Sequence, residues 1–84
     1  MPLTTLADLP IGGSAKISAL EGGAALQRRL LDLGFTAGET VRCLFAAPSG
    51  EPRAYLTAGA VIALRRASAR SIFISQAGGD GRGF

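Results

Sequence analysis

The segment 24–38 constrains the fold more than any other stretch, because it combines a helical pattern with an abrupt end. Three leucines recur at i, i+4 and i+7 and form one apolar stripe on a helix: Leu26, Leu30 and Leu33. Gly34 follows the last leucine, where a helix that ends in a left-handed residue favours glycine. We therefore expect a short amphipathic helix that ends at Gly34, with Phe35 folded back onto Leu30 and a strand following.

Most of the remaining chain consists of short runs in which apolar and polar residues alternate. A period of two predicts half-buried strands. Five runs show this pattern: residues 15–20, 39–46, 53–57, 60–65 and 71–75. Turn-forming residues at 48–52 and a tight turn at Ala58–Gly59 are expected to join the middle runs as hairpins.

The alternation also predicts which side chains face the core. In the strand at 39–46 the inward residues are expected to be Val41, Cys43 and Phe45. In the last two strands they are expected to be Ile62, Leu64, Ile72 and Ile74. Single helical turns are expected near residues 5–8 and 66–70, the first because Thr5 and Asp8 have the spacing of a helix N-terminus.

A chain of 84 residues is long enough for one small domain. Five short strands in one small domain favour a barrel, because closure removes exposed sheet edges. The two hairpin turns are similar to the meander of an SH3-like barrel. We predict a mainly β fold over residues 1–76, a small SH3-like barrel of about five strands with one inserted α-helix and a short N-terminal helical turn. Residues 77–84, rich in glycine, are expected to form a flexible tail.

The composition argues against catalysis and against a metal centre. The chain has no histidine, which removes the usual general base at neutral pH and the commonest transition-metal ligand. Its single cysteine, Cys43, excludes an internal disulfide and is expected to be a small packing residue. Asp32, Glu39 and Glu51 stand in turns or on a helix surface, where solvated carboxylates are expected. We predict no enzymatic activity, no catalytic residue, no cofactor and no metal site.

The hydropathy pattern indicates a cytoplasmic protein. No apolar run approaches the roughly 20 residues of a membrane span. The first ten residues lack the basic and apolar regions of a secretory signal. The chain is therefore expected not to be embedded in a membrane.

The arginines are the better candidates for function. Nine basic residues against six acidic ones give a net charge of +3, which favours contact with anionic groups. Ion pairing, as between Arg28 and Asp32 at i, i+4, is the alternative role for a single arginine. Leu31 falls off the leucine stripe and could join the arginines in a docking surface. The candidate partner-binding residues are Arg28, Arg29, Leu31, Arg65, Arg66 and Arg70.

Several motifs together resemble the FeoA family, small cytosolic proteins of bacterial ferrous-iron transport. The matching segments are residues 6–12 (LADLPIG), 29–35 (RLLDLGF), 37–41 (AGETV), 47–52 (APSGEP) and 62–65 (IALR). The resemblance extends from Leu3 to about Ser75. Ala37 departs from the family, in which proline is common before the glycine of that turn.

The resemblance implies an SH3-like barrel and an accessory role toward FeoB, the membrane Fe(II) transporter with a cytosolic GTP-binding domain. The partner surface would then be the cytosolic region of FeoB, with the chain recruited to the inner face of the membrane. Activation and inhibition of transport both stay open, as does the oligomeric state. Two alternatives also stay open: a small basic barrel that binds nucleic acid, and a metal-responsive regulator that uses carboxylates.

Overall fold

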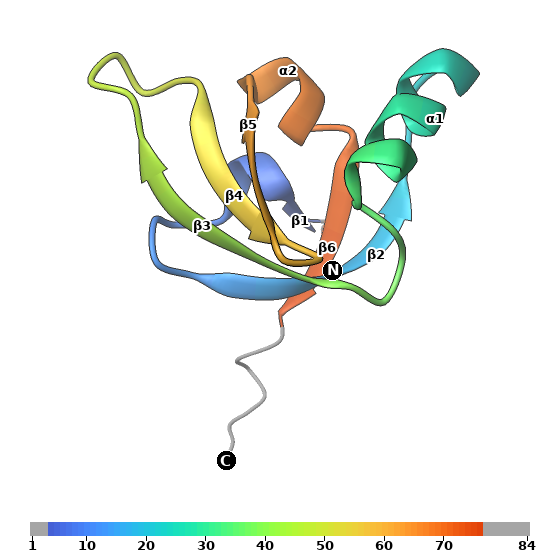
Figure 1. Cartoon of the computed structure of the whole chain (residues 1–84), viewed down its shortest axis with the longest axis horizontal. Coiled ribbons are helices and arrows are strands. Elements are labelled where there is room, and N and C mark those ends of the chain that lie inside the picture. The colour runs from blue at the N-terminus through green and yellow to red at the C-terminus, as the bar shows by residue number, and fades with distance from the viewer. Residues whose placement is uncertain (1–3, 77–84) are drawn as a thin grey trace.

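The computed structural model describes residues 4–76, and the expected tail at 77–84 lies outside them (Figure 1). The elements in chain order are β1 (Thr4–Thr5), the 3-10 turn η1 (Leu6–Asp8), β2 (Ser14–Leu20), α1 (Ala24–Leu33), β3 (Thr40–Ala46), β4 (Arg53–Thr57), β5 (Ala60–Leu64), α2 (Arg66–Ala69) and β6 (Ile72–Gln76). The strand bounds agree with the alternating runs to within one residue, apart from β1, which the alternation did not predict.

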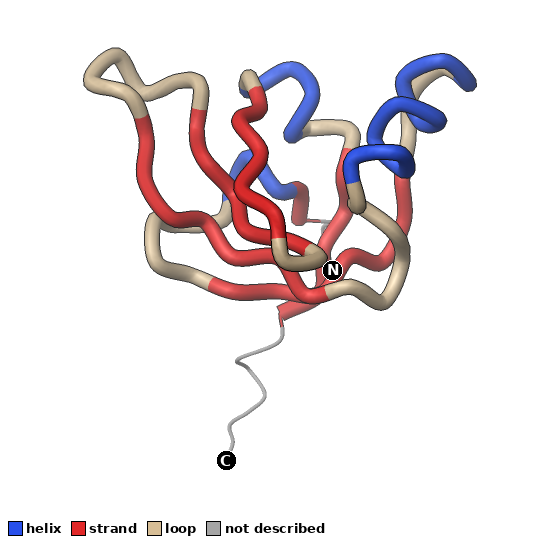
Figure 2. Tube along the Cα trace, viewed as in Figure 1, coloured by secondary structure: helices blue, strands red, loops and turns tan. Residues whose placement is uncertain are grey.

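All strands belong to one antiparallel sheet with the order β1-β6-β2-β3-β4-β5. The sheet bends into a half-open bowl, with α1 and α2 above its open side (Figure 2). The expectation of about five strands in a closed barrel was wrong, since six strands form a sheet that is not closed. The extra strand, β1, pairs through Thr4 and Thr5 only and is too short to show alternation.

A two-residue turn sets the register of β4 against β5. Ala58 and Gly59 both have positive φ, 51° and 79°, as a type I′ hairpin turn requires. Thr57 therefore faces Ala60, and the pairing continues to Arg53 opposite Leu64. This register places the core side chains of β4 and β5 on the same face of the sheet.

Phe45 does not face the core, contrary to the alternation. The register of β3 against β4 shifts between Cys43 and Phe45, which is a β-bulge around Leu44. The inserted residue moves Phe45 to the opposite face, where its side chain is 60% exposed, while Cys43 stays buried. The burial of Cys43 confirms its predicted packing role.

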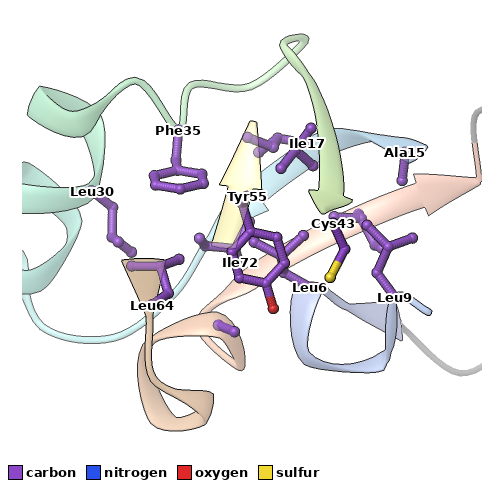
Figure 3. Close-up of a cluster of buried hydrophobic side chains, with 13 residues drawn as sticks. Leu6, Leu9, Ala15, Ile17, Leu30, Phe35, Cys43, Tyr55, Leu64 and Ile72 are labelled. Atoms are coloured by element: carbon purple, nitrogen blue, oxygen red, sulfur yellow. The ribbon is translucent and has the colours of Figure 1, made fainter. Parts of the chain in front are cut away.

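The core fills the open side of the bent sheet, where η1, α1 and α2 contribute the buried residues Leu6, Leu30 and Ala69 (Figure 3). Leu30 is the fully buried residue of the helix, and the other two stripe leucines pack partly buried against the same cluster. Gly34 has φ 110°, and the N–H of Phe35 donates to the carbonyl of Leu30 at 3.0 Å. The glycine therefore ends the helix and returns Phe35 to Leu30, as predicted. The Thr57 hydroxyl donates to the Gly34 carbonyl at 3.4 Å and fixes this helix end on β4.

Candidate interaction surface

The six predicted partner-binding residues do not line a single hollow. Arg28 and Leu31 lie along the outer side of α1, where they line an open hollow of about 440 Å³ with Asp32. Leu31 is 46% exposed, so the fold does not cover it. Arg70 is exposed directly after α2 and does not line this hollow.

Arg29 and Arg65 lie around one hollow although 36 positions separate them in the sequence. Both line a hollow of about 390 Å³, to which α1 contributes Arg29 and α2 contributes Ser68. The remaining lining residues are Pro52, Ala63 and Leu64. The hollow therefore adjoins the C-terminal end of β5 and carries two cationic side chains.

Arg66 has a structural role through its backbone. Its N–H donates to the Glu51 carboxylate at 2.8 Å, which joins the loop between β3 and β4 to the start of α2. The Glu51 carboxylate therefore makes a structural contact. Its side chain caps a backbone N–H group at the start of α2.

Arg53 makes side-chain contacts that the sequence analysis did not predict. Its guanidinium is half-buried and donates from Nη1 to the carbonyl of Leu9 at 2.6 Å, with Cys43 Sγ at 3.9 Å. Arg53 thus ties β4 to the segment before β2. The available signal was its position in β4, two residues before the core residue Tyr55 and therefore on the same face of the strand.

Tyr55 is the largest fully buried side chain of the core, with 1% of its surface exposed. Burial raises the pKa of its hydroxyl above the usual value of 10, and the nearby Cys43 adds to the rise. The Arg53 guanidinium opposes the shift because it favours the tyrosinate. The hydroxyl is therefore protonated at neutral pH and is not a general base.

The raised pKa of Tyr55 predicts a loss of stability in alkali. Above pH 10 the unfolded chain releases this proton while the folded chain retains it, so the unfolded state binds fewer protons and the free energy of unfolding falls as pH rises. In Tyr55→Phe, the free energy of unfolding should decrease less between pH 10 and pH 11 than in the wild type. Urea denaturation between pH 8 and pH 11 checks it. Ultraviolet titration of tyrosinate in the wild type reports one residue, since the chain has one tyrosine and no tryptophan. Equal alkaline slopes for both proteins would contradict the assignment.

The outer face of β3, β4 and β5 carries exposed apolar side chains that the sequence reasoning did not single out. Leu56 lies opposite Val61 on one side and Arg42 on the other, and Phe45 lies opposite Ala54. Phe45, Leu56 and Val61 are exposed, Val61 to 58%. We call these three residues the outer apolar row. Arginine beside exposed apolar side chains is typical of protein interfaces.

Within residues 4–76, no three His, Cys, Asp or Glu side chains are close enough to share a metal ion. No helix in this range is long and apolar enough to cross a membrane.

A bent antiparallel sheet that is not closed, with short helices over its open side, is the architecture of a small SH3-like domain. The FeoA domain model matches residues 4–76, and the chain belongs to the FeoA family. The resemblance seen in the sequence is thereby confirmed.

Solved structures agree with the family. FeoA from Chlorobium tepidum is 30% identical, with a TM-score of 0.85 over 96% of this chain and 80% of that one. FeoA from Stenotrophomonas maltophilia, complexed with zinc and described as an SH3 domain protein, is 33% identical, with a TM-score of 0.76 over 86% of this chain and 89% of that one. A manganese-dependent transcriptional repressor shares the fold alone, at 14% identity and a TM-score of 0.79 over 89% of this chain and 42% of that one. No curated protein sequence matches the chain.

Proposed function

We propose that this chain is a non-enzymatic accessory protein of bacterial Fe(II) transport, acting in the cytoplasm by binding the cytosolic region of a FeoB-type transporter. Family membership supports the transport role, and the S. maltophilia relative is described as possibly acting as a ferrous iron transport activating factor. The observation that carries a binding role is the surface itself. Exposed arginines flank exposed apolar side chains on a domain whose one tyrosine hydroxyl and one thiol are buried.

Such a surface can regulate a transporter without chemistry. A binding partner shifts an equilibrium only by its differential affinity for the two states. If the chain binds one nucleotide state of the GTP-binding domain more tightly, it raises the population of that state, and nucleotide changes its affinity by the same factor. Recruitment to the inner face of the membrane follows from this contact.

The alternatives receive less support from the described residues. Nucleic-acid binding on a small barrel uses exposed aromatic residues beside cationic grooves. Here Phe35 and Tyr55 are buried, and no aromatic residue lines the hollow of Arg29 and Arg65. A carboxylate metal switch would need acids in proximity, which residues 4–76 do not supply.

The test combines binding with transport. The purified chain should bind the purified cytosolic region of the FeoB-type transporter from the same organism, measured by calorimetry with GDP and with a non-hydrolysable GTP analogue. Deletion of the gene should alter Fe(II) uptake, and expression of the intact chain should restore it. Unchanged uptake in the deletion strain, together with no measurable binding in either nucleotide state, would refute the proposal.

A further inference from the structure

We propose that the free edge of β5 accepts an extended, acidic segment of the partner as an added strand, with its carboxylates held by Arg29 and Arg65. This inference rests on the proposed function and adds to it the docking surface and the chemistry of the bound segment. Four features of the described residues carry it: the unpaired edge, its lack of protection, the two arginines at its end and the apolar row beside it.

The edge presents a defined set of backbone groups. β5 is the last strand in the sheet order, and no strand within residues 4–76 pairs with its outer side (Figure 2). In a two-residue hairpin the pair that flanks the turn is hydrogen-bonded, which here is Thr57 with Ala60. Alternation then directs the N–H and C=O groups of Val61 and Ala63 away from β4, toward the free edge. An incoming strand would find these groups ready to pair.

This edge lacks the devices by which proteins usually block strand addition. Edge strands are typically very short, bulged, or interrupted by proline, lysine or an inward charge. β1, the opposite edge, is two residues long and fits that pattern. β5 has the sequence AVIAL over five residues, with a regular register against β4 and no charged residue or proline. Proteins are known to recognise extended peptides by adding them as a strand to an open edge of this kind.

The positive charges beside the edge of β5 favour an acidic segment as the bound strand. The hollow at the C-terminal end of β5 is lined by Arg29 and Arg65 and by no acidic residue. Arginine binds carboxylates through two parallel N–H donors. A second copy of this chain would bring no acid in its own β5 and would add another Arg65. An acidic segment of a different protein is therefore the better match.

The outer apolar row indicates which residue types the rest of the bound segment should carry. Val61 stands beside Leu56 on the outer face, so an added strand would place alternate side chains next to Val61 and Ala63. Apolar residues at those positions would continue the row, and an acid beyond them would reach Arg29 and Arg65. The expected segment thus alternates apolar residues and ends in Asp or Glu at the arginine side.

Two variants of the full chain test the inference against the transporter's cytosolic region. Val61→Pro removes an outward N–H while leaving the β4–β5 hydrogen bonds intact, and should weaken binding at least about tenfold. The double variant Arg29→Glu with Arg65→Glu should weaken it about a hundredfold through two lost charge-assisted contacts. The matched control is Arg28→Glu with Arg70→Glu, which changes the net charge equally but lies outside the hollow and should bind far better than the Arg29 and Arg65 pair.

Amide hydrogen exchange in the wild-type chain tests the inference without any substitution, so misfolding of a variant cannot affect the result. On complex formation, the exchange of the Val61 and Ala63 amides should slow strongly. If the wild type binds but these amides still exchange freely, or if both double variants lose equal affinity, the edge is not the docking site and only this inference fails. If the wild type does not bind the transporter region, the proposed function fails.

A peptide-display selection tests the inference without the transporter. A library of random ten-residue peptides is selected on the immobilised wild-type chain. Selected peptides should alternate apolar residues, carry Asp or Glu, and lose binding to Val61→Pro. Absence of enriched peptides, or enrichment of peptides indifferent to Val61→Pro and to the Arg29 and Arg65 pair, would overturn it. Dimers whose formation Val61→Pro abolishes would identify a second copy as the occupant instead.

Discussion

Replacing Phe35 by alanine is expected to lower the free energy of unfolding by about 3–5 kcal/mol. The ring is 0% exposed and packs in the main core cluster, directly after the glycine that ends α1 (Figure 3). Its removal leaves a cavity where the helix end meets the sheet. Domains of this size have roughly 5–15 kcal/mol of stability in total, so the variant should unfold at a much lower urea concentration.

Phe45→Ala is the matched control, because it makes the same chemical change on the exposed face of the sheet. Its side chain is 60% exposed, and its loss of stability should stay within about 0.5–1 kcal/mol. Urea denaturation followed by circular dichroism measures both. Similar losses for the two variants would mean that the bulge at Leu44 does not turn Phe45 outward.

The second large effect is expected from Arg53→Met, which should cost about 1–3 kcal/mol of stability. Methionine retains most of the aliphatic volume but leaves the carbonyl of Leu9 without its donor. Leu9 is buried, so water replaces the lost bond poorly. Because the partner is a carbonyl that stays in place, an apolar replacement does not relieve both sides of the contact.

Arg42→Met provides the comparison for Arg53→Met. Arg42 lies on the adjacent strand but is exposed, and its replacement should change stability by no more than about 0.5 kcal/mol. A second readout separates the role of Arg53 from general weakening. Since the Arg53 guanidinium opposes the rise in the pKa of Tyr55, Arg53→Met should move the tyrosinate titration to still higher pH. An unchanged titration together with unchanged stability would contradict the proposed contact.

Local patterns in the sequence were sufficient where one segment decides its own conformation. The leucine spacing and Gly34 predicted a helix over α1 with a left-handed end, and the helix and the φ of 110° confirm both. Alternation predicted the inward residues of β5 and β6 because side-chain direction in a regular strand follows from position alone. The family could also be identified from the sequence, because each of its motifs is a short continuous segment of the chain.

Only the tertiary structure decided features that depend on which segments pair. The bulge at Leu44 exists only relative to β4, so no pattern within β3 could show that Phe45 faces outward. Whether β5 is an edge depends on whether another strand of residues 4–76 pairs with it. That Arg29 and Arg65 line one hollow depends on how α1 and α2 stand over the open side of the sheet. Helix ends, and the faces of strands that no bulge interrupts, are set by short-range backbone and side-chain geometry. Strand neighbours and surface clusters are set by contacts between residues far apart in the chain, which is why the sequence supplied the candidate residues but the fold decided which of them act together.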